Sequence, residues 1–317
     1  MQADCHRHLA GSLSVPYVWS LIHKHKAFQA AKDIEDVKRK MTYLNGEQQD
    51  FQLFLKKFNI LNSIPWKLED VRTAVECVLT SLRQEGINYC ELKFSLYKYG
   101  HDNAVQAARI ICEELQKVRE GGLLVLPILS FKYEGQLAEQ IWLSNSILQD
   151  KVSEQIHGID FVGDERFFND PNVQDVCKII CQDWLAYGKM IAMHVGESQT
   201  GLNVREAIKM GARRICHGLR ALQDDPAVLD FAKDLGVCFD MALSSNFRTG
   251  VVKDLRDHPI RQFLRKGCEV TIGTDDPIVL NTTLENEYRI AKGLVNLAEE
   301  EIEILKMNAA ERRQAVS

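Results

Sequence analysis

Three histidines and one aspartate stand in short motifs that are far apart in the sequence. His6 and His8 lie near the start, His194 follows an apolar run, and Asp275 comes near the end. In a β-strand, residues i and i+2 project from the same face, so the imidazoles of His6 and His8 would point into one space. Imidazole nitrogens with a carboxylate are a typical ligand set for a divalent metal such as Zn²⁺. The pattern predicts a metal site.

Further ionisable residues lie next to these candidate ligands and suit proton chemistry. Glu197 comes three residues after His194, and a carboxyl group in a closed, water-poor site has a raised pKa and can donate a proton. His217 is suited to orient a water molecule and accept its proton. Asp276 is placed to reach a substrate nitrogen, and Gly163 permits close approach of its backbone N–H to a planar ligand. The combination predicts a metal-dependent hydrolytic enzyme.

Two of these residues have alternative structural roles. Glu197 would form an ordinary ion pair if Arg205 or Arg213 lay beside it. Asp276 would cap a helix if one began at Pro277.

The sequence favours one metal ion over two. Barrel hydrolases with two metals need a bridging ligand, often a modified lysine at the end of the fourth strand. The segment that ends the fourth predicted strand, Ile159-Asp160-Phe161-Val162-Gly163-Asp164-Glu165, contains no lysine. We therefore expect one Zn²⁺ per chain.

Short apolar runs alternate with amphipathic helical patterns along the chain, and the polar motifs follow the apolar runs. This alternation is typical of a (β/α)₈ barrel, and a doubly wound sheet would share it. The barrel is favoured because its carboxyl ends converge on one mouth, whereas an open sheet would spread the polar residues along a line. The eight predicted strands are Ala3–Leu9, Tyr89–Phe94, Leu123–Phe131, Gly158–Val162, Met190–Val195, Arg214–Cys216, Val237–Met241 and Glu269–Ile272.

The connection between the first two predicted strands is too long for one crossover helix. It covers residues 10–88 and is rich in helix-forming residues. We expect residues 16–63 to form helices that close over a ligand at the barrel mouth. The alternative is a structural insertion on the side of the barrel. Residues 1–317 are expected to form a single domain, because no linker or internal repeat divides them.

Composition restricts the partners of the chain. A net charge of −5 and a pI near 6.0 argue against a nucleic-acid surface, and no apolar run is long enough to span a membrane. Nine cysteines without a CxxC pair indicate buried free thiols in a reducing cytoplasm. We expect a cytoplasmic protein that binds a small molecule and is a monomer or a weak homo-oligomer.

The motifs resemble those of the adenosine and AMP deaminases over nearly the whole chain. The matching segments, in order, are His6-Arg7-His8-Leu9-Ala10-Gly11-Ser12, Gly163-Asp164-Glu165, His194-Val195-Gly196-Glu197, His217-Gly218, Ser244-Ser245-Asn246, Thr274-Asp275-Asp276-Pro277 and Asn308-Ala309-Ala310. The resemblance implies a zinc-containing (β/α)₈ barrel that replaces an exocyclic amino group of a purine nucleoside or nucleotide by oxygen and releases ammonia.

The same resemblance implies a role for each site residue. Zinc would be held by His6, His8, His194 and Asp275. Glu197 would donate a proton to ring N1, and His217 would orient and deprotonate the water. His8, Gly163 and Asp276 would line the substrate site, with Gly163 at N3 and Asp276 at N7.

One position departs from the family pattern. Ala10 stands where adenosine-specific members have an aspartate that is expected to bind the 5′ hydroxyl of the sugar. The substrate alternatives are therefore adenosine itself, a 5′-modified adenosine, N6-methyl-AMP and free adenine. The scattered Lys24, Lys26, Lys56 and Lys57 of the predicted lid are candidates for a phosphate contact.

Two other functions remain open from the sequence. One is a hydrolase that cleaves a cyclic amide or ester at the same metal site. The other is a non-catalytic relative that binds a nucleoside or a protein partner. Release of ammonia from a purine distinguishes the deaminase from both. The zinc deaminases that act on nucleic-acid bases carry a Pro-Cys-x-x-Cys motif, which this chain lacks.

Overall fold

Eight parallel strands form the centre of the molecule in the computed structural model, which describes residues 2–27, 30–44 and 46–314. Neighbouring strands in the sheet are also consecutive in the sequence, from β1 to β8. The strands are β1 (Ala3–His8), β2 (Tyr89–Phe94), β3 (Leu124–Lys132), β4 (Gly158–Val162), β5 (Met190–Val195), β6 (Arg214–His217), β7 (Cys238–Met241) and β8 (Glu269–Ile272). All eight predicted strands are confirmed, with their ends within about one residue.

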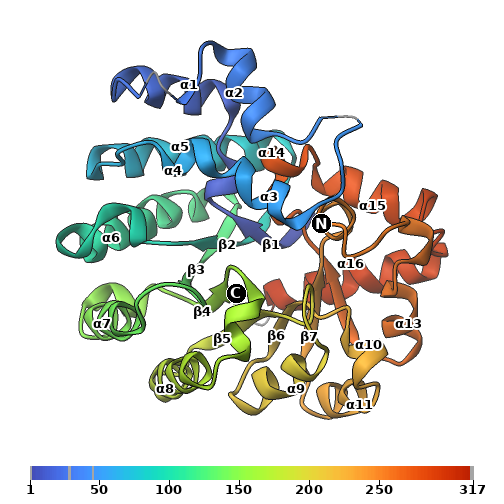
Figure 1. The fold of residues 1–317 in the computed structure, drawn as a ribbon. Helices are drawn as coiled ribbons and strands as arrows, with labels where there is room; N and C mark the ends of the chain where they lie inside the picture. The colour runs from blue at the N-terminus through green and yellow to red at the C-terminus, as the bar shows by residue number, and fades with distance from the viewer. Residues whose placement is uncertain (1, 28–29, 45, 315–317) are drawn as a thin grey trace.

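The first and last strands meet through the residue that follows β8. The backbone N–H of Asp275 donates to the carbonyl of His6 at 2.7 Å, and the N–H of His8 donates to the carbonyl of Asp275 at 2.8 Å. These bonds bring the ends of the sheet together in a nearly closed ring (Figure 1). The predicted (β/α)₈ barrel is confirmed.

Helices surround the strands and cover their outer face (Figure 1). Those that follow the second strand are α6 (His101–Lys117), α7 (Leu137–Leu148), α8 (Pro171–Ala186), α9 (Leu202–Lys209), α10 (Ala221–Asp224), α11 (Ala227–Asp234), α12 (Leu243–Arg248), α13 (Ile260–Arg265), α14 (Pro277–Leu280), α15 (Leu284–Gly293) and α16 (Glu299–Gln314). Helix α11 begins only after Pro226. Asp225 precedes Pro226 and has an extended φ of −146°, because a residue before proline is disfavoured in the helical region.

The segment between β1 and β2 contains the extra helices that its length predicts. They are α1 (Val15–Lys24), α2 (Ile34–Met41), α3 (Phe51–Lys57) and α4 (Asn59–Asn62), followed by the crossover helix α5 (Leu68–Gln84). The side chains of Ser14, Asp33 and Asp50 accept backbone N–H bonds at the starts of α1, α2 and α3. These caps explain where the three helices begin.

The extra helices are attached to the barrel opening next to β1. Tyr43 donates its backbone N–H to the carbonyl of Val279 at 2.7 Å, and Asp50 donates its N–H to the carbonyl of Arg248 at 3.0 Å. Val279 follows β8 and Arg248 follows β7. The chain that leaves β1 therefore reaches the loops after β7 and β8 before it returns to α5.

The barrel interior contains paired charges rather than apolar side chains alone. Arg214 contacts Glu91 at 2.7 Å and Asp240 at 2.5 Å, and Lys93 contacts Asp160 at 3.0 Å. Each of these side chains is buried, so each charge needs its partner. None of the helices in the described ranges is long and apolar enough to cross a membrane.

Candidate active site

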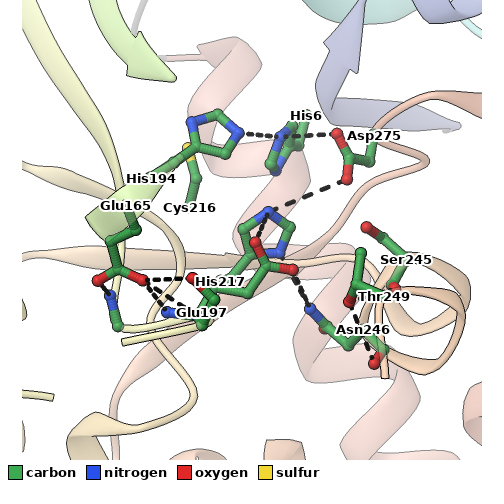
Figure 2. A network of polar contacts seen from close by, with 12 residues as sticks. His6, Glu165, His194, Glu197, Cys216, His217, Ser245, Asn246, Thr249 and Asp275 are labelled. Atoms are coloured by element: carbon green, nitrogen blue, oxygen red, sulfur yellow. Dashed lines mark hydrogen bonds and ion pairs between the residues drawn. The ribbon is translucent and has the colours of Figure 1, made fainter. Parts of the chain in front are cut away.

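Three imidazoles and a carboxylate converge at the carboxyl end of the barrel. The Nε2 atoms of His6, His8 and His194 lie 3.1–3.3 Å from one another, and Asp275 Oδ1 lies 3.3 Å from His8 Nε2 and 3.5 Å from His6 Nε2 (Figure 2 shows His6, His194 and Asp275). Ligands of a tetrahedral zinc, each about 2.0–2.1 Å from the ion, are separated by about 3.3 Å. The four residues match that geometry and present only nitrogen and oxygen donors.

Backbone conformation directs two of the polar side chains into the barrel mouth. His217 ends β6 with a φ of +69°, and Asp275 follows β8 with a φ of +60°. Left-handed backbone is uncommon for residues other than glycine and is concentrated at functional sites. At both positions the left-handed conformation is strained, and it places the side chain among the other polar side chains of the site.

A second layer of residues fixes the orientation of His194. Its Nδ1 atom lies 3.1 Å from Oδ1 of Asp160, while the other oxygen of Asp160 accepts a bond from Lys93 Nζ at 3.0 Å. A carboxylate on the far nitrogen of a metal-binding histidine sets its tautomer and leaves Nε2 free as a ligand. Lys93 balances the charge of Asp160, so the carboxylate remains ionised in the barrel interior.

Glu197 lies next to this cluster in a buried turn. Burial raises the pKa of Glu197 to about 8, and the negative charge of Asp275 contributes in the same direction. The carboxyl group therefore holds a proton at neutral pH and can donate it. Within the described ranges neither Arg205 nor Arg213 forms an ion pair with it; Arg205 pairs instead with Asp225 at 2.6 Å.

His217 is close to both Glu197 and Asp275 (Figure 2). Its Nε2 atom lies 3.6 Å from Glu197 Oε2 and 3.9 Å from Asp275 Oδ2. Burial lowers the pKa of His217 to about 3, so the ring is neutral and can accept a proton. The side-chain amide nitrogen of Asn246 lies 3.1 Å from His217 Nδ1 and donates to Glu197 Oε1 at 3.3 Å. One amide thus contacts both candidate proton-transfer groups.

The turn that carries Glu197 is held by a second, buried glutamate. Glu165 accepts the backbone N–H groups of residues 196, 197, 198 and 199 at 2.5–3.2 Å, and the amide of Asn203 at 3.0 Å (Figure 2). Four consecutive turn amides directed at one carboxylate leave the backbone little freedom. Glu165 thereby fixes the position of Glu197.

Asp276 and Gly163 lie on opposite sides of the mouth. Asp276 occupies the N-cap position of α14, yet its side chain makes no capping bond, and its buried Oδ1 has no partner among the described residues. A buried polar atom without a partner indicates a place for a ligand group. A Cβ atom at Gly11 would collide with Asp276, and one at Gly163 (φ +106°) would collide with Glu134, so both glycines are required by these contacts.

Several residues of the site carried no role in the sequence argument. Asp160, Glu165 and Asn246 lie in or beside the strand-end motifs, but each acts through a tertiary contact with a distant segment. Their position in or beside these motifs is the only feature of the sequence that could have identified them as site residues. Lys93 had no signal beyond being a charge in an otherwise apolar strand.

The comparison with known protein families matches the adenosine deaminase family over residues 2–315. The adenosine deaminase of Shewanella denitrificans is 26% identical over 317 residues, which cover 97% of this chain and 92% of the relative. The adenosine deaminase of Serratia proteamaculans is 27% identical and covers 96% of this chain and 91% of the relative.

Solved structures share the fold at lower identity. Adenine deaminase from Arthrobacter aurescens has a TM-score of 0.83 and 19% identity, covering 98% of this chain and 92% of that one. An amidohydrolase from Burkholderia ambifaria with bound Zn has a TM-score of 0.82 and 16% identity, covering 98% of this chain and 84% of that one. The N6-methyl-AMP deaminase of Arabidopsis thaliana has a TM-score of 0.77 and 18% identity, covering 96% of this chain and 90% of that one. Together with the family match and the site geometry, we conclude that this chain belongs to the adenosine deaminase family and is a hydrolytic deaminase acting on carbon–nitrogen bonds.

Proposed function

We propose that this protein is a zinc-dependent deaminase that converts a 6-aminopurine nucleoside or nucleotide into the 6-oxopurine and ammonia. The observation that carries the proposal is the meeting of three imidazole Nε2 atoms within 3.3 Å of one another beside a carboxylate and the buried Glu197. A metal ligand set next to a protonated carboxyl group suits hydrolysis at an aromatic amidine carbon, which needs a nucleophile and a proton donor at once.

His6, His8, His194 and Asp275 are the proposed zinc ligands. Zinc has no redox chemistry, accepts nitrogen and oxygen donors in a tetrahedral set, and when bound supplies the Lewis acidity that makes water a nucleophile near neutral pH. The donor atoms of these residues all lie within 4.8 Å of one another, and the tautomer of His194 is set by Asp160.

His217 and Glu197 divide the proton transfers between them. The attacking water forms a bond to purine C6 and gives a proton to the neutral imidazole of His217. Glu197 gives its proton to ring N1, which takes up the electron pair displaced from the C6–N1 double bond. His217 then returns the proton it received to the amino group, the C6–N bond breaks and ammonia leaves. The proton of the C6 hydroxyl passes to the Glu197 carboxylate as the C6 carbonyl forms, which gives the 6-oxopurine. The raised pKa of Glu197 and the lowered pKa of His217 provide the starting protonation states that these steps need.

The purine ring itself is proposed to lie between Gly163 and Asp276. Gly163 offers its backbone N–H to N3, and Asp276, whose pKa is raised by burial and by Asp275, offers a proton to N7. His8, half-buried at the end of β1, lines the same space. Three ring nitrogens would thus each meet one polar group, which fixes the orientation of C6 toward the proposed ligands.

We also propose that residues 16–63, with helices α1–α4, act as a lid. They are attached to the segments after β7 and β8, which lie beside β1 at the opening, and α3 carries the half-buried apolar side chains of Phe51, Phe54 and Leu55. An apolar cover excludes water and strengthens the electrostatic contacts beneath it.

The direct test is ammonia release from a panel of adenosine, deoxyadenosine, adenine, AMP, N6-methyl-AMP and a 5′-thio-substituted adenosine. The named relatives act on adenosine, adenine and N6-methyl-AMP, and Ala10 leaves the 5′ specificity open, so the panel covers each alternative. Zinc bound without turnover on any purine would reject the proposal in favour of a non-catalytic binding role.

Two variants test the residue roles. Glu197→Gln should retain zinc and lose nearly all turnover, because the amide cannot donate a proton to N1. His6→Ala should lose zinc, as measured by metal analysis. Full zinc occupancy in His6→Ala would remove His6 from the ligand set, and substantial turnover in Glu197→Gln would remove Glu197 as the donor.

A further inference from the structure

Two lysines at the barrel mouth have no acidic partner in the described parts of the chain. Lys98 lies in the short 3₁₀ turn Tyr97–Tyr99 that follows β2, and Lys132 is the last residue of β3. The Nζ atom of Lys98 lies 5.5 Å from the ring centre of Trp66, and that of Lys132 lies 5.5 Å from the ring centre of Tyr97. No carboxylate in the described ranges forms an ion pair with either ammonium group.

Two of the four lid lysines that the sequence offered for a phosphate contact already have acidic partners. Lys24 lies 2.7–2.8 Å from the carboxylates of Asp70 and Glu69, and Lys57 lies 2.8 Å from that of Glu47. Their charges are already balanced within the protein. Lys26 and Lys56 also form no ion pair within the described ranges but are exposed, whereas Lys98 and Lys132 are half-buried.

The strand register places Lys132 on the interior face of the barrel. Ser130 pairs with Asp160, and Lys132 pairs with Val162, the residue before Gly163. Asp160 points into the interior, where it contacts His194. Residues two apart on a strand share a face, so Lys132 projects on the same side as Ser130 and Asp160, one step closer to the mouth.

Lys98 and Lys132 are close enough to repel each other. Burial and, to a smaller extent, the positive charge of Lys132 together lower the pKa of Lys98 to about 8. Two ammonium groups that face one another without a counter-ion are stabilised by an anion that contacts both. The rings of Trp66 and Tyr97 lie within cation–π reach of these ammonium groups but supply no negative charge.

The proposed purine contacts point the sugar toward these lysines. Glu197 at N1, Gly163 at N3 and Asp276 at N7 come from the ends of β5, β4 and β8. N9, which carries the sugar, lies between N3 and N7 on the side of the purine away from C6. With N3 at β4 and N7 at β8, the sugar would extend over the ends of β1, β2 and β3. Those three strands lie between β8 and β4 in the ring and lead to Ala10, Lys98 and Lys132.

Resting on the proposed function, we propose that Lys98 and Lys132 bind an anionic group at the 5′ end of the substrate, and that this group is a phosphate monoester. Two ammonium charges match the charge of −1.5 to −2 that a phosphate monoester carries near pH 7. Ala10 fits the same assignment, because an aspartate at that position would repel a phosphate. The substrate is then an adenine-type nucleoside 5′-monophosphate rather than a nucleoside.

The test compares matched substrates and products on matched variants. AMP, adenosine and adenosine 5′-carboxylic acid are compared by kcat/KM, and the products inosine 5′-monophosphate and inosine by equilibrium binding. Lys98→Met and Lys132→Met should each weaken inosine 5′-monophosphate binding and lower kcat/KM for AMP by about tenfold or more, with little effect on inosine and adenosine. Lys178→Met, at an exposed position on α8, is the control and should change none of these values.

Ala10→Asp provides a test in the opposite direction. It should lower kcat/KM for AMP and raise that for adenosine, because the carboxylate repels a phosphate and accepts a bond from a hydroxyl. On the unmodified protein, a rise in ionic strength should weaken binding of inosine 5′-monophosphate and leave inosine binding unchanged. This last measurement tests the charge contact even if a lysine variant fails to fold.

The outcomes separate this inference from the proposed function. Deamination of adenosine at least as efficient as that of AMP, with the lysine variants altering both alike, overturns the anion site and leaves the deaminase intact. Absence of ammonia from every purine, with inosine 5′-monophosphate still bound through the lysines, keeps the anion site and rejects the deaminase. A preference for the 5′-carboxylate with the same dependence on both lysines retains the anion site and replaces the phosphate by a carboxylate.

Discussion

At the scale of single residues, Asp160 determines how His194 meets a metal ion. It contacts Nδ1 of His194 with one oxygen and Lys93 with the other. Removing the carboxylate in Asp160→Ala leaves the imidazole free to rotate and Lys93 without its partner. We expect zinc affinity to fall about 10- to 100-fold, measured by competition with a chelator of known affinity.

The neighbouring Ser130 offers a matched control for that experiment. It pairs with Asp160 in the sheet and is buried, and its hydroxyl has no hydrogen-bond partner among the described residues. Ser130→Ala should keep the affinity of the parent protein. Equal affinity in Asp160→Ala and Ser130→Ala would show that the carboxylate does not orient the ligand.

Glu165 acts on Glu197 through the backbone of the turn. Replacement by glutamine puts an N–H₂ group against amides that need an acceptor, so the turn must shift. A shift of about 1 Å in a proton donor costs on the order of 100-fold in rate. We expect kcat of Glu165→Gln to fall by that order while zinc content stays unchanged. Asp164→Asn, which alters a carboxylate paired with exposed Arg166, is the control and should retain kcat; an unchanged kcat in Glu165→Gln would refute the role.

At the scale of elements, the sequence predicted the strands well because each is a short apolar run closed by a polar motif. His6 and His8 are on β1 and His194 is on β5 as expected. The contacts between elements were not predictable in the same way. Glu165 contacts a turn that begins 31 residues later in the sequence, and Asn246 contacts His217, 29 residues earlier. These partners come together only in the completed barrel. The proximity of Lys98 and Lys132 also could not be predicted, because it depends on the packing of neighbouring strand ends.

Helices α12 and α15 are joined by a buried carboxyl group with its own pH dependence. Glu287 on α15 accepts the N–H of Ser244 on α12 at 3.0 Å and a bond from Thr282 at 2.7 Å. Burial raises the pKa of Glu287 from 4.5 to about 7. Because the folded-state pKa is the higher one, the stabilising contribution is complete below pH 4.5 and is lost as the pH rises through 7.

Glu287→Gln should remove this dependence. The parent protein is expected to lose roughly 3 kcal/mol of unfolding free energy between pH 5 and pH 8 relative to the glutamine variant, which has no proton to lose. Urea unfolding at the two pH values measures the difference. Glu285→Gln, at an exposed position of the same helix, should follow the parent. Identical pH profiles for all three proteins would mean that Glu287 stays in one protonation state.

At the scale of the whole molecule, the proposed metal site joins strands from the beginning, middle and end of the chain. His6 and His8 are on β1, His194 is on β5, and Asp275 follows β8. An ion bound by the folded protein and not by the unfolded chain stabilises the fold, by about 4 kcal/mol at a free concentration 1,000 times the Kd. Removal of zinc with a chelator should therefore lower Tm by about 5–10 °C.

The comparison with a variant makes that prediction specific. His6→Ala, which lacks a proposed ligand, should show the lower Tm from the start and no further change with chelator. A parent protein whose Tm is insensitive to chelation would indicate that the four side chains do not share a tightly bound ion. The measurement needs no substrate, so it is independent of which purine is deaminated.

The separation of the proposed ligands in the sequence has a consequence for the order of events during protein synthesis. His8 and Asp275 are 267 residues apart, counting 275 − 8. At about 5–20 residues per second, a ribosome needs on the order of 15–50 s to make the intervening chain. For the first 186 of these residues, counting 194 − 8, only His6 and His8 are available, and two imidazoles favour Cu²⁺ over Zn²⁺ on intrinsic affinity; His194 then adds a third imidazole. The complete four-donor set exists only once Asp275 has been made, so we expect selection for a tetrahedral ion to act late in translation.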